Sequence, residues 1–291
     1  MNPADTVPGT PARSAVKNHA DNKVHCSVGI LTYNSEKTLR RALESVKDFS
    51  DIIICDGGST DGTLDIARGY NAHIIPQDRV FKDELGRIAD FAGVRNQTLD
   101  AAKENWFLFI DSDEYISKEL EGEIRRIIAK QTEGAFTLFR RYVAGEEEVM
   151  CATAYPNRSM RFFARSSADS FIKKVHERIR LKPGVTAENM GGVLYVPVDP
   201  AEGINVVKMD YYISLQIEQL KTSNSGFYGT FWTIFWRHAR VSLLYLLRLV
   251  RIRLFCTGKK MPLTHELGAH VYHARLMIAM WRRRVEFGQN Q

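Results

Sequence analysis

One stretch constrains the fold of this chain more than any other: five apolar residues in a row lead directly into a cluster of acids. Residues 106–110 read WFLFI, and Asp111, Asp113 and Glu114 follow within four positions. Such a run is typical of a strand buried in a parallel sheet. Because ligands of open α/β sheets bind at the carboxyl edge of the strands, we expect the acids at a binding edge. Two aspartates one residue apart suit a hard cation such as Mg²⁺, whereas a helix cap is the alternative interpretation.

Strand-like and helix-like patterns alternate along the rest of the N-terminal part. Apolar runs predict strands at 24–32, 51–55, 72–76 and 106–111. Helical spacing of apolar residues predicts helices at 36–46, 63–70 and 87–102. This alternation is typical of βαβ units, so we predict an α/β nucleotide-binding layer around a parallel sheet.

Two more polar clusters follow predicted strands. Thr32, Tyr33 and Asn34 end the first strand, and Asp56 and Gly57 follow the second. The tyrosine ring could stack on a base, and the aspartate could accept from the imide N–H of a uracil-like base. The glycine lets the backbone approach a ligand, or it simply turns the chain. Three clusters at successive strand ends predict one shared ligand site.

Charge and cysteine usage narrow the class of protein. The net charge of +6 favours an anionic partner, such as a nucleoside diphosphate or a membrane surface. No nucleic-acid partner is expected, because the chain has no recognisable nucleic-acid-binding motif. The four cysteines form no C-x-x-C pair, so we expect neither a zinc knuckle nor a disulfide framework, but a reducing compartment.

The two ends of the chain differ from its centre. Residues 1–22 lack an apolar run and are predicted to be a disordered tail rather than a signal peptide. We predict a catalytic domain at 23–200 and a helical, basic extension at 201–291, with helices at 206–221 and 227–256. Arginines interrupt each apolar window before the ~20 residues that a bilayer-spanning helix needs. The second helix therefore either lies on an anionic membrane surface or packs on the catalytic domain with its arginines outward.

Three of these motifs together resemble the family 2 glycosyltransferases of the GT-A fold. They are VGILTYN at 28–34, IICDGGSTDGT at 53–63 and FIDSDE at 109–114, and the match in order and spacing extends over 24–130. Two later motifs are similar to the lipopolysaccharide-core β-glucosyltransferase branch, RFF at 161–163 and VHER at 175–178.

The resemblance implies a donor site. The nucleoside would contact the residues of the first two clusters, and Arg95 would lie at the nucleotide. Asp111 would lie near the ribose and the metal, and Asp113 would ligate Mg²⁺ or Mn²⁺ bridging the diphosphate. Arg161, together with other nearby cations, would supply positive charge to the diphosphate; these are Arg158, Arg165 and Arg178.

The resemblance also implies an inverting transfer of a hexose. The donor would be a nucleoside diphosphate sugar, preferably of uridine, and the acceptor a glycan or lipid-linked saccharide in cell-surface polysaccharide or lipopolysaccharide synthesis. Inversion needs one base to accept the proton of the acceptor hydroxyl. Glu177 is the predicted base, and His176 is the alternative, either as base or as a metal ligand. We expect a cytoplasmic enzyme, peripheral on the inner face of the membrane. The alternative function is an inactive nucleotide-sugar-binding module in a membrane-associated assembly.

Overall fold

The computed structural model describes residues 23–130, 132–201, 203–221 and 226–288. The predicted disordered tail, residues 1–22, lies outside the described residues.

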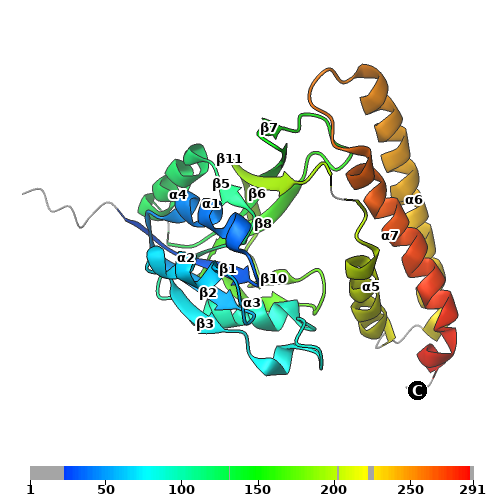
Figure 1. The fold of residues 1–291 in the computed structure, drawn as a ribbon, viewed down its shortest axis with the longest axis horizontal. Helices are drawn as coiled ribbons and strands as arrows, with labels where there is room; N and C mark the ends of the chain where they lie inside the picture. The colour runs from blue at the N-terminus through cyan, green and yellow to red at the C-terminus, as the bar shows by residue number, and fades with distance from the viewer. Residues whose placement is uncertain (1–22, 131, 202, 222–225, 289–291) are drawn as a thin grey trace, which may run out of the picture.

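A nine-stranded mixed sheet forms the centre of the molecule (Figure 1). Its first half consists of parallel strands in the order β3, β2, β1, β4. Their bounds are Val24–Thr32 for β1, Phe49–Asp56 for β2, His73–Pro76 for β3 and Trp106–Asp111 for β4. The carboxyl ends of β1, β2 and β4 therefore lie at one edge, as the sequence predicts.

Beyond β4 the strands of the sheet no longer all run in the same direction. The order continues as β8, β6, β11 and β5, with β7 paired to β6, and β8 runs antiparallel to both β4 and β6. These strands span Tyr115–Ile116 (β5), Ala135–Ala144 (β6), Glu147–Glu148 (β7), Arg158–Ala164 (β8) and Ala187–Val198 (β11). Leu108 pairs with Phe162, so Arg161 lies beside the carboxyl end of β4. A separate hairpin contains β9 (Ala168–Ile172) and β10 (Arg178–Leu181).

Helices cover both faces of the sheet. They are α1 (Glu36–Val46), α2 (Thr63–Gly69), α3 (Phe91–Asp100) and α4 (Lys118–Lys130). One apolar core contains residues of α1 and α4, and the other contains residues of α3. The third helix begins later than the predicted residue 87, because the Asp90 side chain caps it by accepting from the Gly93 amide at 2.9 Å. The described residues also contain short 3₁₀ segments, η2 (Arg79–Phe81), η3 (Arg165–Ser167) and η4 (Arg284–Gly288).

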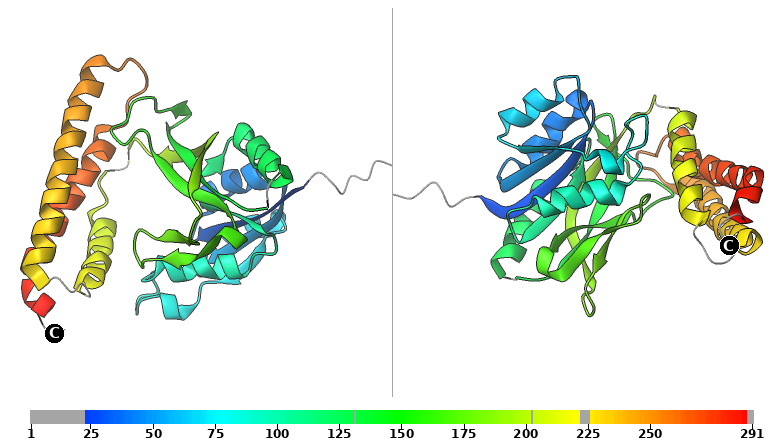
Figure 2. Two further views of the ribbon diagram at one scale, coloured as in Figure 1. Left: turned by 180° about the vertical axis from the view of Figure 1, so that it is seen from behind. Right: turned by 90° about the horizontal axis from the view of Figure 1, so that it is seen from below.

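The C-terminal helices form a separate layer to one side of the sheet (Figures 1 and 2). They are α5 (Val206–Lys221), α6 (Gly226–Phe255) and α7 (Leu263–Arg282), close to the predicted bounds. They share an apolar core of their own, made of Ile213, Ile217, Phe231, Ile234, Leu276 and Met280. Among the described residues, no helix combines the length and the apolar character required to cross a membrane.

Among the described contacts that attach this layer to the α/β part, two lie in separate places. In the first, the Thr153 amide donates to the buried Glu266 carboxylate of α7 at 3.1 Å. In the second, the Tyr211 hydroxyl of α5 donates to the carbonyl of Ile88 at 2.9 Å. The extension is therefore held near β8 and near the start of α3.

A disulfide reinforces the first attachment. Cys151 is bonded to Cys256 across 105 residues, with 6.4 Å between the Cα atoms. The spacing argued against a disulfide framework, yet this one disulfide forms, because cysteine spacing reports only local pairing, whereas the fold brings the end of α6 to the loop before β8. Cys26 and Cys55 are free and buried.

Candidate active site

The loop after β2 is organised around the Asp56 carboxylate. One oxygen accepts from Thr32 Oγ1 at 2.8 Å and Ser59 Oγ at 2.6 Å, and the other accepts from the amides of Gly58 and Ser59, each at 2.8 Å. Burial opposes the charge, but these hydrogen bonds outweigh it and hold the pKa of Asp56 below its ordinary value. Because a carboxylate has about four acceptor positions, all of them are used within the loop. This differs from the expectation that Asp56 accepts from a base.

The cluster after β1 is hydrogen-bonded to the same loop. Asn34 has a left-handed φ of 48°, its amide donates to Ser59 Oγ at 2.9 Å, and its side-chain oxygen accepts from the Thr60 amide at 2.9 Å. The Tyr33 side chain is 65% exposed. The first two predicted clusters therefore form one hydrogen-bonded wall, with the exposed Tyr33 ring on its surface.

Gly57 lies where the loop after β2 packs closely against the side chains of Tyr33 and Gln77. A β-carbon at this position would lie 3.1 Å from both the Tyr33 ring and Gln77 Oε1. The Gly57 carbonyl accepts from Lys82 Nζ at 2.8 Å, and Gln77 Nε2 donates to the carbonyl of Cys55 at 3.1 Å. The glycine at 57 is thus favoured by close packing, whereas the turn itself relies on Gly58, which has a left-handed φ of 98°.

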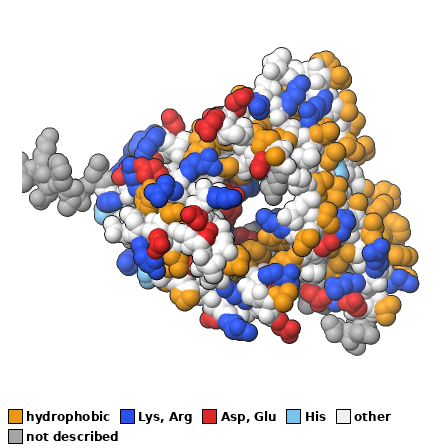
Figure 3. All heavy atoms as spheres, in the orientation of Figure 1, with side chains coloured by type: hydrophobic (Ala, Val, Ile, Leu, Met, Phe, Trp, Pro, Cys, Tyr) orange, Lys and Arg blue, Asp and Glu red, His pale blue; other side chains and the backbone are white. Residues whose placement is uncertain are grey.

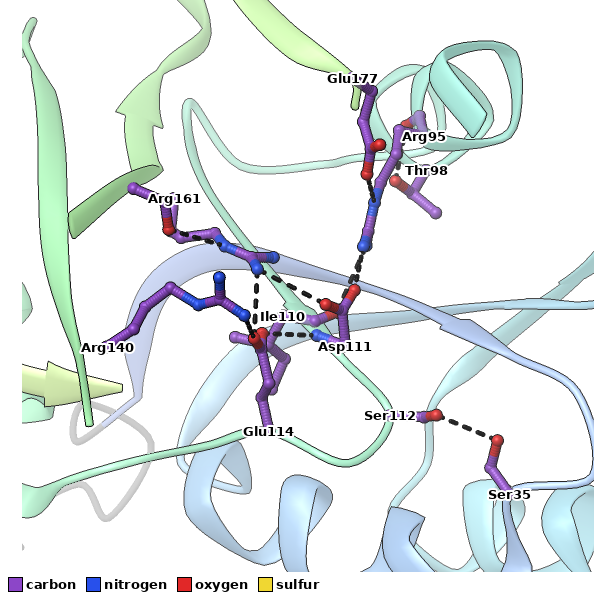
Figure 4. Close-up of polar contacts among 11 residues, drawn as sticks. Ser35, Arg95, Thr98, Ile110, Asp111, Ser112, Glu114, Arg140, Arg161 and Glu177 are labelled. Carbon is purple, nitrogen blue, oxygen red and sulfur yellow. Dashed lines mark hydrogen bonds and ion pairs between the residues drawn. The ribbon is translucent and has the colours of Figure 1, made fainter. Parts of the chain in front are cut away.

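Two guanidinium groups hold Asp111 at the end of β4 (Figure 4). Arg95 Nη2 donates to one carboxylate oxygen, and Arg161 Nη2 lies 3.4 Å from the other. Desolvation opposes the charge on Asp111, but Arg95 and then Arg161 outweigh it and hold its pKa far below the ordinary value. Asp111 is therefore an anion at neutral pH, with both of its oxygens already paired.

Glu114 lies at the centre of a buried charge network beneath Asp111 (Figure 4). It accepts from Arg140 Nη2 at 2.8 Å, from Arg161 Nη2 at 3.1 Å and from the Asp111 amide at 3.0 Å. It orients Asp111, since α4 begins only at Lys118.

Asp113 has a different environment from its acidic neighbours. Its side chain reaches the surface, and no other residue in the described part of the chain is hydrogen-bonded or ion-paired to its carboxylate. The protein around it still desolvates the carboxylate, and this desolvation, followed by repulsion from Asp111, raises the pKa of Asp113. A free carboxylate with a neighbouring negative charge can receive a cation.

The turn between β9 and β10 brings the predicted bases to this edge. Glu177 Oε1 lies 3.5 Å from Arg95 Nε, so Arg95 contacts both Glu177 and Asp111 (Figure 4). Lys173 and His176 have left-handed φ values of 74° and 55°, a conformation that costs energy in residues with side chains. Desolvation, followed by the charges of Arg178 and Lys173, lowers the pKa of His176 against the opposing effect of Glu177. The imidazole is therefore neutral at pH 7.

Helix α5 covers part of this edge. Tyr212 stacks on Phe91 with 5.7 Å between the ring centroids. Burial, followed by the charges of Glu177 and Asp111, raises the pKa of Tyr212. The charge of Lys208 in turn favours ionisation of Asp113. The C-terminal layer thus contributes side chains to the surroundings of both carboxylate clusters.

Several of these residues carry no sequence signal for the site. Arg140, Gln77 and Lys82 belong to no motif, and Lys208 and Tyr212 lie on a helix predicted only from its periodicity. Only tertiary pairing brings them to the edge. Of the other predicted cations, two donate to backbone carbonyls: Arg158 to Met190 and Arg165 to Ala102.

The class of protein follows from this arrangement, and the family follows from comparison. A curled mixed sheet with an acidic end at β4 and C-terminal helices to one side is the GT-A-like α/β fold of glycosyltransferases. Residues 27–179, more than half of the chain, match the model described as Glycosyl transferase family 2. The chain belongs to this family.

Individual relatives match shorter segments. The SPbeta prophage-derived glycosyltransferase SunS of Bacillus subtilis (strain 168) is 36% identical over 100 residues, 34% of this chain and 22% of the relative. An uncharacterized glycosyltransferase of Rickettsia bellii (strain RML369-C) is 35% identical over 115 residues, 39% of this chain and 36% of the relative. The chain thus spans well under half the length of these curated relatives.

The solved structures that match the chain are more distant in sequence. S. aureus TarS 1-349 in complex with UDP is 19% identical with a TM-score of 0.39, covering 68% of this chain and 66% of the other. Glucosyl-3-phosphoglycerate synthase from Mycobacterium tuberculosis, in complex with Mn²⁺, UDP and phosphoglyceric acid, is 20% identical with a TM-score of 0.32. It covers 43% of this chain and 45% of the other.

Proposed function

We propose that this glycosyltransferase moves a hexose, with inversion, from a UDP sugar to a hydroxyl group of a glycan or lipid-linked saccharide. The observation that carries the proposal is the position of Arg95, whose guanidinium contacts Asp111 on the donor side and Glu177 on the other. A candidate base and a candidate donor site are therefore parts of one charge cluster. We place the reaction in cell-surface polysaccharide or lipopolysaccharide synthesis, in the lipopolysaccharide-core branch, on the cytoplasmic side of the membrane.

The nucleoside part of the donor would bind along the wall formed by the first two clusters. The exposed Tyr33 ring offers a surface on which a base can stack. Thr32, Asn34 and Asp56 are hydrogen-bonded within the wall, and we propose that they hold its shape while the backbone at Gly57 lies beside the ligand. A wall that is rigid before the donor arrives lowers the entropy lost on binding.

Asp113 and Asp111 fit a divalent cation that the donor diphosphate completes. In the described part of the chain, no group of three or more His, Cys, Asp or Glu side chains is arranged to hold a metal. Mg²⁺ is commonly held by one or two carboxylates plus substrate phosphates. Asp113 would be the main ligand, since Asp111 is paired to two guanidinium groups. Mg²⁺ or Mn²⁺ bound here supplies positive charge that offsets the charge of the departing diphosphate.

Glu177 would accept the proton of the acceptor hydroxyl. The acceptor oxygen forms a bond to the anomeric carbon, while the bond from that carbon to the phosphate oxygen breaks and its electron pair leaves with UDP. The ion pair with Arg95 orients the Glu177 carboxylate. His176, exposed and neutral beside it, is the second candidate for this role.

The donor site is tested with Asp113→Ala. Titration of UDP in the presence and absence of Mn²⁺ should show metal-dependent binding that weakens by about tenfold or more in the variant, as expected when a metal ligand is lost. Asp169→Ala, which changes an exposed aspartate on β9, is the matched control. Binding that does not depend on metal, or an unchanged Asp113→Ala variant, would contradict the metal assignment.

The base is tested with Glu177→Gln. Release of UDP from a panel of UDP sugars should fall by about 100- to 10,000-fold, with UDP affinity retained. Glu188→Gln on β11 is exposed and serves as the control. If His176→Ala alone produces this loss, the two roles are exchanged. Donor binding without turnover in the unaltered protein, with any acceptor, would indicate the inactive binding module instead.

A further inference from the structure

Helix α6 has apolar side chains on two faces, and only one of these faces is packed. Phe231, Ile234 and Leu249 are buried on the first face. A second row on roughly the opposite side is 49% to 70% exposed, and we call it the outer stripe: Tyr228, Trp232, Trp236, Leu243, Leu247, Val250 and Leu254. At 3.6 residues per turn, these seven positions fall within about 100° of the helix circumference. Figure 3 shows hydrophobic and cationic side chains along the outer edge of the C-terminal helices.

Positive charge borders the outer stripe. Residues 226–255 contain five arginines and no aspartate or glutamate. Arg237, Arg240 and Arg251 are exposed, and helical spacing places all three along one edge of the stripe. Among the described residues, none of the three has an ion-pair partner, so their charge is directed to solvent or to a ligand.

The composition of this surface fits one kind of partner best. Apolar rows of this size are uncommon on free surfaces and mark interaction sites. A second copy of α6 laid against the stripe would bring arginines close to arginines, which is unfavourable. An anionic lipid surface offers apolar chains to the stripe and phosphates to the arginines. Tryptophan and tyrosine, present at three of the seven positions, favour the boundary between lipid and water.

We propose that α6 lies flat in the surface of an anionic lipid bilayer, with the outer stripe in the acyl boundary and Arg237, Arg240 and Arg251 at lipid phosphates. This inference makes the location proposed above more specific. It rests on the proposed function in one respect: membrane binding would give the enzyme access to a lipid-linked acceptor. Vesicle binding can be measured without donor or acceptor, so each proposal can fail alone.

The test is co-sedimentation of the full chain with two kinds of vesicle, pure phosphatidylcholine and phosphatidylcholine mixed with phosphatidylglycerol. The protein should bind the mixed vesicles, less so at high salt, and tryptophan fluorescence should shift to shorter wavelength. An arginine near an anionic surface contributes about fivefold to affinity. The combined Arg237→Gln, Arg240→Gln and Arg251→Gln variant should therefore bind on the order of 100-fold more weakly.

A second variant tests the apolar component. The combined Trp236→Gln and Leu247→Gln variant should also lose on the order of 100-fold in vesicle affinity. Leu85→Gln and Arg126→Gln change exposed residues outside the C-terminal helices and should bind as the unaltered protein does. Each variant must retain the circular dichroism spectrum and the melting temperature of the parent.

Two results would overturn the proposal. One is equal binding of the unaltered protein and the triple arginine variant to the mixed vesicles. The other is absence of vesicle binding together with a dimer in light scattering that the Trp236→Gln and Leu247→Gln variant dissociates. That result would assign the outer stripe to a second copy of the chain. If the unaltered protein binds the vesicles but does not turn over any UDP sugar, only the proposed function is contradicted.

Discussion

Replacing Glu114 with leucine should lower the free energy of unfolding by about 3 to 5 kcal/mol, the usual cost of removing one partner from a buried charge network. The Glu114 side chain is 1% exposed and accepts from three donors. Arg140, 24% exposed, can turn toward solvent, but Arg161 is only 8% exposed and keeps two long contacts, to Asp111 at 3.4 Å and to Ser159 Oγ at 3.3 Å. Most of the loss should therefore arise at Arg161 and at the unpaired Asp111 amide.

Urea unfolding followed by circular dichroism measures this loss. With a denaturant dependence of about 3 kcal/mol per molar urea, the midpoint should fall by roughly 1 to 1.7 M. Glu188→Leu, at an exposed position on β11, should leave the midpoint unchanged. Combining Glu114→Leu with Arg140→Met and Arg161→Met should recover most of the stability, because no buried charge is then left unpaired. A loss below about 1 kcal/mol for Glu114→Leu, the range of a surface ion pair, would refute this reasoning.

Further predictions concern the loop after β2 and the cysteines. Because the folded-state pKa of Asp56 lies below its unfolded value of about 3.9, its stabilising contribution is complete above that value and is lost as the pH falls through the folded pKa. The free energy of unfolding of Asp56→Asn should therefore decrease less between about pH 5 and 3 than that of the parent. The same decrease in both proteins would contradict this. Peptide mapping without reductant should recover Cys151 linked to Cys256, and Cys26 and Cys55 should react with iodoacetamide only after unfolding. Because disulfides are rare in reducing cytosol, the state of this pair in fresh cell extract also tests the proposed location.

The predictable part of the fold is the part with a local pattern. The strand at 106–111 was predicted to the residue, because an apolar run ending in acids has one natural place in a parallel sheet. The third helix was predicted four residues too early, because periodicity does not reveal that Asp90 caps it. The helices at the C-terminus follow their apolar spacing, although the spacing does not say which of the two apolar faces of α6 is packed.

The unpredictable part depends on partners distant in sequence. Glu114 was assigned to a motif but not to a role, since Arg140 and Arg161 reach it from β6 and β8. The antiparallel insertion of β8 beside β4 has no local signal, yet it determines which arginine meets Asp111. Asp56 was correctly placed at a strand end, whereas its four internal hydrogen bonds could not be foreseen from the residue types alone.

The two attachments of the C-terminal layer have a consequence for acceptor length. Thr153 is bonded to Glu266 near β8, and Tyr211 is bonded to Ile88 near the start of α3. The disulfide lies beside the first of these contacts. Together they set the tilt and the height, relative to α6, of the sheet edge where Asp111 and Asp113 lie. If α6 rests on a bilayer and the acceptor is lipid-linked, as proposed, the acceptor hydroxyl must be presented at one distance above the lipid. The enzyme would then act as a molecular ruler, selecting among lipid-linked saccharides by how far they extend as well as by which sugar they end in.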